Sequence, residues 1–434
     1  MPKIVVIGGG ISGLAVAWYL SMEGHEVDVY EAEDTLGGNC RAVPLGQNWV
    51  DIYYHVVSTN SSPMRDLIAS LGLDSDLYPV RTSMAFNHEG KLYPVSGIAD
   101  YLKFAPLTTW NKFQLIICLL RSLLVKKWQY LDGELARDWL ISIGGKEIYN
   151  KIWRPVMHAK FGNKTDEIVA TDMWYRLNRM WFTTLGRKNQ GPFYIKGTMK
   201  YFFDRFEEGL IKLGASVHKQ NPVSLIETND NHVKGVVLAS GVSVACEHVV
   251  AAIPLPRLVS IMPSQKVPFK DETRQIQFLN NICLILKTER PISQYYQVAF
   301  SDPTSPFTGI ISGEQFYPPE EYGGYVTYLT RYFMGQEELF NVSSKQLLEE
   351  YLPYIRKVKS DFKLNEVIDL QIVKGHDVEP LHTLHYSKML PPILTSLPGL
   401  SLLNQAHIYP EPTVLDVSVS YAKKAAKLIS STLS

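Results

Sequence analysis

The chain has 434 residues, of which 46% are hydrophobic and 20% charged, as expected of a folded globular protein with two or three domains. Its 43 basic and 43 acidic residues cancel, which disfavours nucleic acid as a partner. The four cysteines form no CxxC pair, which argues against a disulfide framework and a zinc site. With no charged leader and cleavage site at the N-terminus, we expect a reducing, cytoplasmic setting.

The first 31 residues carry a nucleotide-binding pattern. A buried parallel strand is predicted over residues 3–7, KIVVI, and the glycine-rich turn GGGISG and a helix follow it. Gly8 permits the tight turn, Gly10 lets the backbone approach a pyrophosphate, and Gly13 lets the helix pack on the strand. A second strand ends at Glu31, which is placed to bind ribose hydroxyls. This order of elements predicts a dinucleotide site.

A second glycine pair, Gly37 and Gly38, follows this acid. An acid at position 31 would repel a 2′-phosphate, so NADP is disfavoured and NAD and FAD remain. NAD has no need of a second close approach of the backbone at this point. An extended FAD would run its ribityl chain and ring past this loop, so the pair favours FAD.

The stretch from Val5 to Asn39, VVIGGGISGLAVAWYLSMEGHEVDVYEAEDTLGGN, resembles flavoproteins of the amine oxidase, protoporphyrinogen oxidase, carotenoid desaturase and UDP-galactopyranose mutase group. This resemblance implies FAD, and in that group the glycine pair after the acid touches it. The cofactor-binding residues predicted from the motif and the resemblance are Gly8, Gly10, Ile11, Ser12, Gly13, Glu31, Ala32, Gly37, Gly38, Asn39, Arg41, Tyr54, His55, Val223, Asn404, Val414 and Leu415.

The resemblance extends over nearly the whole chain and implies an α/β fold with interleaved domains. A Rossmann-like FAD-binding domain of the glutathione-reductase type is expected over 1–80, 214–260 and 385–434. An α+β substrate domain with a helical cap is expected over 81–213 and 261–384. Within the latter, residues 98–210 have a mainly helical, aromatic-rich pattern.

The apolar run FQLIICLLRSLLV, residues 113–125, is too short for a membrane span, because its 13 residues would cover roughly 20 Å as a helix. One interpretation is a buried helix of the cap. The other is a helix that lies on a membrane surface or lines an apolar substrate tunnel, with Lys112, Lys126 and Lys127 beside it.

Several residues near the expected flavin position follow from the resemblance. The last helix should point its positive N-terminal end, at residues 413–415, toward the flavin. Asn404 stands where relatives have aspartate. Tyr54 and His55 are expected to end a strand and resemble a mutase stretch that lies on the flavin face, so His55 is a candidate catalytic proton donor or acceptor.

Other positions limit the choice of reaction. Asn281 aligns with the lysine that holds a water near flavin N5 in amine oxidases, which argues against simple amine oxidation. Arg331 falls near the place of a mutase arginine, although a solvated strand arginine is the favoured interpretation. His407 is expected beside the start of the last helix. No metal site is predicted, because His376, His382 and His385 lack ligand spacing.

The leading hypothesis is an FAD-dependent oxidoreductase whose flavin N5 accepts a hydride from an apolar or conjugated small molecule, such as a tetrapyrrole or an isoprenoid, and passes electrons to oxygen or a quinone. One alternative is a redox-neutral sugar-nucleotide mutase that uses reduced flavin. Another is a flavin-binding protein without catalysis. The sequence specifies neither the electron acceptor nor an oligomeric state.

Overall fold

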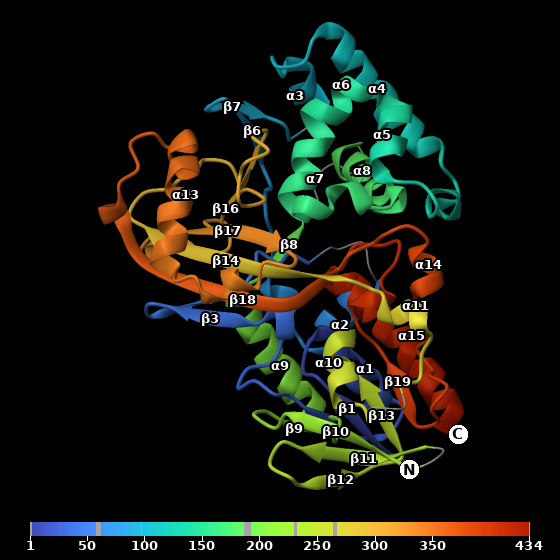
Figure 1. The fold of residues 1–434 in the computed structure, drawn as a ribbon. Helices are drawn as coiled ribbons and strands as arrows, with labels where there is room; N and C mark the ends of the chain where they lie inside the picture. Colours follow the sequence, from blue (N-terminus) through green and yellow to red (C-terminus); the bar gives the residue numbers. More distant parts are fainter. Residues whose placement is uncertain are drawn as a thin grey trace.

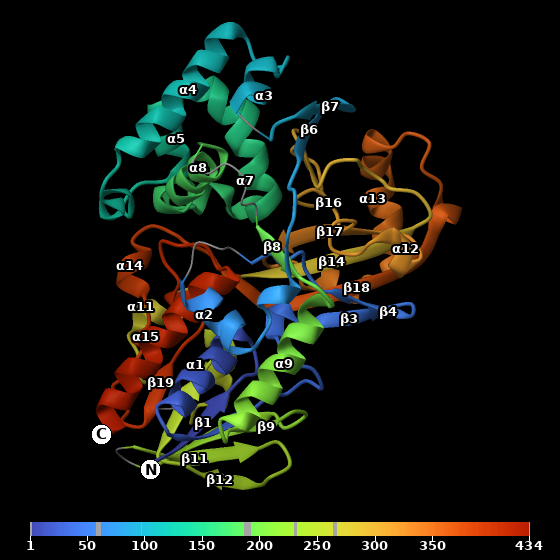
Figure 2. The ribbon, with the colours of Figure 1, turned by 180° about the vertical axis from the view of Figure 1, so that it is seen from behind.

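The computed structural model describes residues 2–57, 62–96, 98–185, 192–229, 232–263 and 267–433. Figures 1 and 2 show three stacked parts: a nucleotide-binding unit at the base, a long-stranded sheet in the middle and a helical cap at the top. This arrangement confirms the predicted α/β fold with a Rossmann-like unit, an α+β substrate unit and a helical cap.

The base unit is built on a five-stranded parallel sheet in the order β19-β13-β1-β2-β9. The strands are β1 (Lys3–Ile7), β2 (Glu26–Tyr30), β9 (Ser216–His218), β13 (His248–Ala251) and β19 (Leu400–Leu402). Since all five run the same way, their carboxyl ends meet at one edge. Ligands of open parallel sheets bind at this edge, so it is the first place to look for a site.

Helices cover one face of this sheet, and a small antiparallel sheet with one helix covers the other. The helices are α1 (Ile11–Met22), α2 (Ser62–Ser70), α9 (Thr198–Lys212) and α15 (Leu415–Leu433). The opposite cover consists of β10 (Val223–Thr228), β11 (Val233–Leu238), β12 (Ser243–Ala245) and α10 (Leu255–Ile261). Both faces are buried, which explains why β1 and β13 are apolar on both sides.

Helix α9 lies just before the predicted domain boundary at residue 213 and packs into the base unit. The boundary places it in the substrate and cap domain, but Phe202, Phe203 and Phe206 are buried in the core of the base unit. The Phe206 ring packs edge-on against Trp18 of α1, with the ring centroids 5.8 Å apart. The apolar face of α9 packs on the core of the base unit. The aromatic composition used for the prediction does not distinguish this core from the core of the cap.

The middle part is a seven-stranded sheet in the order β18-β14-β17-β16-β15-β6-β7. Its strands are β6 (Met84–His88), β7 (Lys91–Pro94), β14 (Phe278–Thr288), β15 (Gln297–Phe300), β16 (Ile310–Ser312), β17 (Tyr325–Phe333) and β18 (Val367–Pro380). The two faces of β14 have different neighbours. Ile282 and Leu284 pack with α13 (Ser344–Val358), whereas Cys283 and Ile285 face the hairpin of β3 (Ala42–Leu45) and β4 (Asn48–Asp51).

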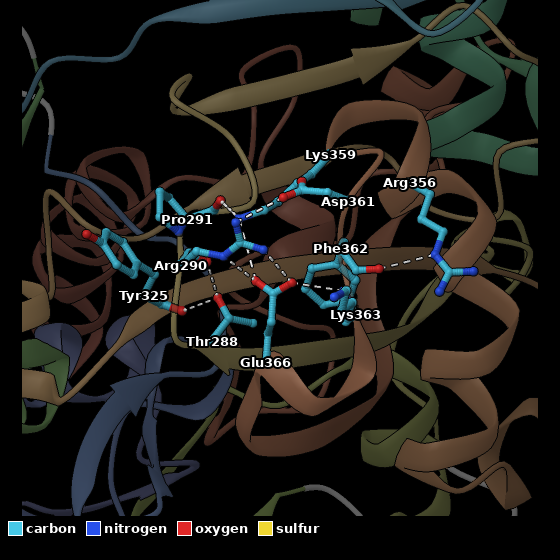
Figure 3. Close-up of polar contacts among 10 residues, drawn as sticks. All are labelled: Thr288, Arg290, Pro291, Tyr325, Arg356, Lys359, Asp361, Phe362, Lys363 and Glu366. Carbon is cyan, nitrogen blue, oxygen red and sulfur yellow. Dashed lines mark hydrogen bonds and ion pairs between the residues drawn. The ribbon is translucent and has the colours of Figure 1, made fainter.

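An ion-pair cluster fixes one end of the two longest strands (Figure 3). Arg290, just after β14, binds both carboxylate oxygens of Glu366, just before β18, at 2.8 and 2.9 Å. Asp361 accepts a further hydrogen bond from the same guanidinium at 2.9 Å. The bidentate contact pins the antiparallel register of β14 and β18, and the other ends of these strands approach the base unit.

The cap contains α3 (Ile98–Lys103), α4 (Thr109–Leu124), α5 (Ala136–Gly144), α6 (Lys146–Ile148), α7 (Arg154–Phe161) and α8 (Ala170–Leu185). A polar network ties it to the end of β18. Lys160 of α7 pairs with Glu379, and Arg176 of α8 pairs with Asp172 at 2.6 Å. His382 Nδ1 lies 3.2 Å from the other oxygen of Asp172. The cap is therefore held over the sheet.

The remaining elements are short. A two-stranded sheet of β5 (Leu77–Pro79) and β8 (Phe193–Ile195) links the units, and three small helices lie in loops: α11 (Asp271–Arg274), α12 (Pro319–Tyr322) and α14 (Tyr386–Met389).

Candidate functional site

The two glycine turns that the sequence separates by more than 20 residues lie side by side. Gly10 and Gly37 form a parallel β-bridge, and the Gly37 amide donates to the Gly9 carbonyl at 2.8 Å. A Cβ on Gly38 would lie 3.3 Å from the Gly10 Cα. Gly37 and Gly38 both have positive φ, at 115° and 54°, which side chains disfavour. The expected second approach of backbone therefore exists at the carboxyl end of β1.

Gly10 and Gly13 of the first turn lack a side chain for different steric reasons. A Cβ on Gly13 would lie 2.0 Å from the Gly8 carbonyl oxygen, so this position is closed by the protein itself. A Cβ on Gly10 would meet nothing closer than Gly38 Cα at 3.9 Å. The backbone of Gly10 therefore faces open space at the N-terminus of α1, where a pyrophosphate would sit. This cradle fits a dinucleotide.

Glu31 lies where the ribose of such a ligand is expected, at the end of β2. It is 9% exposed, and its two carboxylate oxygens accept from the Gly9 amide at 2.6 Å and the Glu33 amide at 2.9 Å. The carboxylate thus braces the glycine turn from within. Each oxygen keeps a further lone pair that a ribose hydroxyl is able to reach.

Replacing Glu31 with alanine should weaken FAD binding without unfolding the chain. The variant loses the ribose acceptor and also frees two backbone donors; each charge-assisted bond is worth about 1.5–3 kcal/mol. Glu31→Gln should lose less, because one acceptor oxygen remains. Titration of FAD into each apoprotein measures the effect, with Glu33→Ala as the exposed neighbouring control. Equal affinity in wild type and Glu31→Ala would show that the ribose lies elsewhere.

The returning segment before β10 flanks Glu31. The backbone amide of Glu31 donates to the His218 carbonyl, and the Asn221 backbone amide donates to the Glu31 carbonyl, both at 2.9 Å. Val223, the predicted adenine neighbour, begins β10 two residues later and is buried. Ala32 is exposed beside this segment. The structure therefore brings Val223 and Ala32 to the side of the cradle where a nucleotide base would follow the ribose.

On the other side of the cradle, residues 38–55 continue the site. Arg41 donates to the Gly38 carbonyl at 3.0 Å, and His55 Nε2 lies 2.8 Å from the Asn39 carbonyl. Because a carbonyl only accepts, His55 carries its proton on Nε2 and leaves Nδ1 as an acceptor. Burial lowers the pKa of His55 below 6.5, which the Asn39 contact partly opposes. His55 is therefore a neutral imidazole at neutral pH.

Tyr54 and His55 do not end a strand, which corrects the prediction. Strand β4 stops at Asp51, residues 52–53 form a bend and residues 54–56 have no regular secondary structure; residues 58–61 lie outside the described residues. Tyr54 packs edge-on against Tyr328 of β17. Burial raises the pKa of Tyr54 above its usual 10, so its hydroxyl stays protonated.

A buried polar cluster that sequence reasoning missed anchors this loop. The Asp51 carboxylate is fully buried and accepts from the Tyr194 hydroxyl at 2.7 Å and the Met199 amide at 2.8 Å. Tyr328 donates to the Asp51 carbonyl at 2.9 Å, and Tyr317 joins the hydroxyl network. Burial raises the pKa of Asp51 to about 7, against the effect of these hydrogen bonds. The partners are spread over nearly 300 residues, so no local pattern reveals them.

The C-terminal predictions fall at the same edge of the parallel sheet. Asn404 accepts from the Ala406 amide at 3.0 Å and donates to the Ile253 carbonyl at 3.1 Å, so both ends of its amide hold the turn after β19. Ile253 in turn borders the Gly8 turn. Val414 and Leu415 start α15, as predicted. The positive N-terminal end of this helix therefore lies at residues 413–415.

His407 is buried behind this turn. Its Nδ1 lies 3.2 Å from the Asn404 amide nitrogen, and burial lowers its pKa to about 4. His407 therefore caps this turn as a neutral imidazole through Nδ1, while its Nε2 is buried without a hydrogen-bond partner.

The two strand residues that bear on the reaction point to opposite faces of the sheet. Asn281 of β14 is fully buried on the face that carries Cys283. Arg331 of β17 pairs with Ile282 in the ladder and reaches Glu350 of α13 at 2.9 Å on the other face. Arg331 is therefore a paired structural arginine on the far side from Asn281.

The other histidines have structural surroundings. His376 stacks on Phe340 with ring centroids 3.9 Å apart, His382 lies against Asp172, and the His385 amide donates to the Asp132 carbonyl. Within the described ranges, no group of three or more histidine, cysteine or acidic side chains is placed to hold a metal ion.

The family model for flavin containing amine oxidoreductases matches residues 11–387. The chain belongs to this family. This flavin-containing amine oxidoreductase is 25% identical over 302 residues to zeta-carotene desaturase of Zea mays and 23% identical over 399 residues to 15-cis-phytoene desaturase of Glycine max. These matches cover 61% and 87% of the chain, and 51% and 69% of the desaturases. A zeta-carotene desaturase of Synechocystis is matched over 63% of its length.

Solved structures share the fold. A protein of Exiguobacterium sp., provisionally assigned as a protoporphyrinogen oxidase, has a TM-score of 0.77 at 18% identity, with 99% of this chain and 98% of that chain covered. Reduced UDP-galactopyranose mutase has a TM-score of 0.75 at 15% identity, with 100% and 94% covered. At these identities the likeness concerns the fold alone.

The family model shows that the chain belongs to the flavin containing amine oxidoreductases, so its cofactor is a flavin. The cradle of this family member fits FAD, because open space at Gly10 and the second glycine turn beside it leave room for a long dinucleotide.

Proposed function

We propose that the enzyme oxidises an apolar or conjugated small molecule. The two glycine turns and Glu31 hold the ADP half of FAD, residues 38–55 border its ring, and the N-terminus of α15 stabilises negative charge on it. When bound, FAD supplies a hydride acceptor at N5. The hydrogen bond from His55 Nε2 to the Asn39 carbonyl fixes the orientation of the imidazole ring, so that Nδ1 is available as a proton acceptor.

One observation carries the choice of substrate class: on the sheet face toward the base unit, the charged Lys287 and Asp369 pair with each other at 2.6 Å beside the β3–β4 turn, and the side chains at Tyr54 and Asn281 are uncharged. Tyr54 and Asn281 contribute uncharged groups there, while Arg331, the strand arginine considered for a nucleotide diphosphate, is bound to Glu350 on the opposite face. Lys160, beside the Tyr332 ring, is neutralised by Glu379. The desaturase relatives, named for zeta-carotene and phytoene, support the same class.

Rapid-mixing spectroscopy of the purified, FAD-loaded enzyme tests this proposal. Anaerobic mixing of the oxidised enzyme with a solubilised polyene such as 15-cis-phytoene, or with protoporphyrinogen, should bleach the visible flavin absorption, because hydride transfer reduces the flavin. UDP-galactopyranose should cause no bleaching. Turnover of the sugar nucleotide only after prior reduction of the flavin would establish a mutase instead, and no response to any of the three would favour a flavin-binding protein without catalysis.

We further propose that α4 attaches the cap to a lipid surface. The helix buries Leu115, Cys118 and Leu119 in the cap, which agrees with the first interpretation of this segment. Its outer side carries an apolar stripe, which we define as Trp110, Phe113, Leu120 and Leu124, with Trp110 64% and Leu124 75% exposed. No helix among the described residues is long and apolar enough to cross a membrane. A surface contact by the stripe is a different mode of binding.

Sedimentation with anionic vesicles at low and high salt should reveal weak, salt-sensitive binding. Lys112, Lys126 and Lys127 flank the stripe, and each lysine near an anionic leaflet contributes about 1 kcal/mol. Changing all three to glutamate should abolish co-sedimentation. The matched control changes the exposed Lys423, Lys424 and Lys427 of α15 to glutamate and should bind as wild type does. Wild-type protein that stays in the supernatant at every salt concentration would refute the attachment.

The cysteines support a reducing, cytoplasmic compartment. Cys40, Cys118, Cys246 and Cys283 are all buried and free. Burial raises the pKa of the Cys40 and Cys283 thiols to about 12, so they behave as small apolar side chains.

A further inference from the structure

One ion pair joins the cap directly to the substrate sheet. Lys160 of α7 binds Glu379 near the end of β18, and the two side chains are only 19% and 20% exposed. The Lys160 ammonium also lies 3.6 Å from the centroid of the Tyr332 ring on β17. Figures 1 and 2 show α7 at the lower edge of the cap, close to this strand. The lysine is therefore held both by a carboxylate and by an aromatic ring of the sheet.

A bulge in β18 precedes Glu379. Leu279 of β14 pairs with Glu379, but beyond this pair residues 376–378 of β18 lie opposite Asn280 alone. The Asn280 side chain accepts from the Asp377 amide at 3.1 Å, and Asp377 has a φ of 51°, which side chains disfavour. Bulges bend a strand and re-aim its side chains, and they are frequent beside active sites.

The bulge gives the end of β18 contacts on two sides. Leu279 is buried in the core of the cap, and directly opposed residues of antiparallel strands point to the same face, so the Glu379 side chain faces the cap. The preceding residue contacts the glycine loop instead, because the Val378 carbonyl accepts from the Asn39 side chain at 3.3 Å. The end of β18 thus links the cradle to the cap.

Lys160 is the principal cation beside Glu379. Arg176 of α8 lies farther from this carboxylate, at 3.8 Å, and is bound to Asp172 at 2.6 Å. An ion pair at this degree of burial adds little stability compared with a hydrophobic contact, but either charge left alone is costly. The pair therefore specifies where α7 meets the sheet more than it stabilises the fold.

We propose that Lys160 and Glu379 are positioning residues, which hold α7 on the substrate sheet so that the cap shields the bound flavin from water. The inference rests on the proposed function, in which an apolar substrate is oxidised between the cap and the sheet. Exclusion of water strengthens the electrostatic interactions of such a site and prevents side reactions. Neither side chain needs to touch the reacting atoms.

Hydrogen exchange and iodide quenching of flavin fluorescence in the FAD-loaded enzyme test the pair, because neither measurement needs a substrate. Glu379→Gln and Lys160→Gln should each raise the exchange rate of the α7 amides about tenfold and the quenching constant about twofold, because each leaves one charge without its partner. The two variants change the local charge in opposite directions, so a rise of quenching in both cannot come from attraction of the iodide anion.

Two further variants separate positioning from a general effect on the cap. Lys160→Arg should match wild type in both measurements, since arginine keeps the cation for the carboxylate and for the ring. Glu167→Gln is the matched control, because Glu167 pairs with Lys164 at 2.7 Å wholly within the cap. It should change neither the exchange of α7 nor the quenching. FAD affinity should stay at the wild-type value in every variant.

Unchanged α7 exchange in both glutamine variants would overturn the proposal, and so would faster exchange with unchanged quenching, since the pair would then not shield the flavin. A rise of equal size in α4 and α5 would also overturn it, because it would show loss of the cap fold. Failure of the polyene and of protoporphyrinogen to bleach the wild-type flavin would refute the proposed substrate class instead, and the exchange and quenching results would still decide the role of the pair.

Discussion

Replacing Gly10 with alanine should abolish tight FAD binding while the apoprotein folds normally. The added methyl group meets no protein atom closer than 3.9 Å, and the backbone is extended, with φ −75°. The substitution should therefore leave the stability of the apoprotein unchanged. It would occupy the open side of the turn, where a pyrophosphate approaches the backbone. We expect a loss of at least a hundredfold in affinity, or about 3 kcal/mol. Titration of FAD into the apoprotein measures it.

Gly13→Ala provides the contrast. Its methyl group would lie 2.0 Å from the Gly8 carbonyl oxygen, so the turn itself must move. We expect the apoprotein to lose about 1–3 kcal/mol of stability in addition to FAD affinity. Circular dichroism during urea unfolding separates the two variants. A Gly10→Ala protein that binds FAD as wild type does would show that no ligand backbone passes this turn.

Replacing Asp51 with asparagine should make the protein more stable at pH 8 but not at pH 4. Burial raises the pKa of Asp51 in the folded chain to about 7, whereas the unfolded value is near 3.8. The Asp51 carboxyl therefore binds its proton more tightly in the folded state than in the unfolded state. Its contribution to the free energy of unfolding is greatest below about pH 4 and is lost as the pH rises through 7. A shift of about 3 units corresponds to roughly 4 kcal/mol.

The measurement is the difference in unfolding free energy between wild type and Asp51→Asn over this pH range. Asparagine keeps the shape and one acceptor for Tyr194 or the Met199 amide, so the difference isolates the buried charge. It should move in favour of the variant by roughly 4 kcal/mol from pH 4 to pH 8. A difference that stays constant with pH would show that Asp51 is ionised throughout, held by its donors.

Local patterns were enough to predict the cradle. The strand, the glycine turn, the helix and the acid lie within 31 consecutive residues, and each has a steric or hydrogen-bonding reason that the structure displays at Gly13 and Glu31. The start of α15 at Leu415 also follows local signals. The fold class was confirmed for the same reason, since such patterns define the parallel sheet.

Long-range packing decided the rest. The Asp51 cluster joins residues from distant segments, so no window of sequence contains it. The aromatic-rich pattern over residues 98–210 does not distinguish the core that α9 enters from the core of the cap. Tyr54 and His55 leave the strand early because the Asp51 carboxylate ties β4 to the start of α9.

The order of the strands in the base unit has a consequence for synthesis on the ribosome. The central strand β1 and helix α1 emerge first, but β19 and α15, which complete the sheet and cover α1, are the last elements of this sequence. At an elongation rate of about 5–20 residues per second, nearly 400 intervening residues take roughly 20 to 80 seconds. During that time the apolar side of α1 lacks its native cover, and exposed apolar surface of this kind makes a partly synthesised chain prone to aggregate.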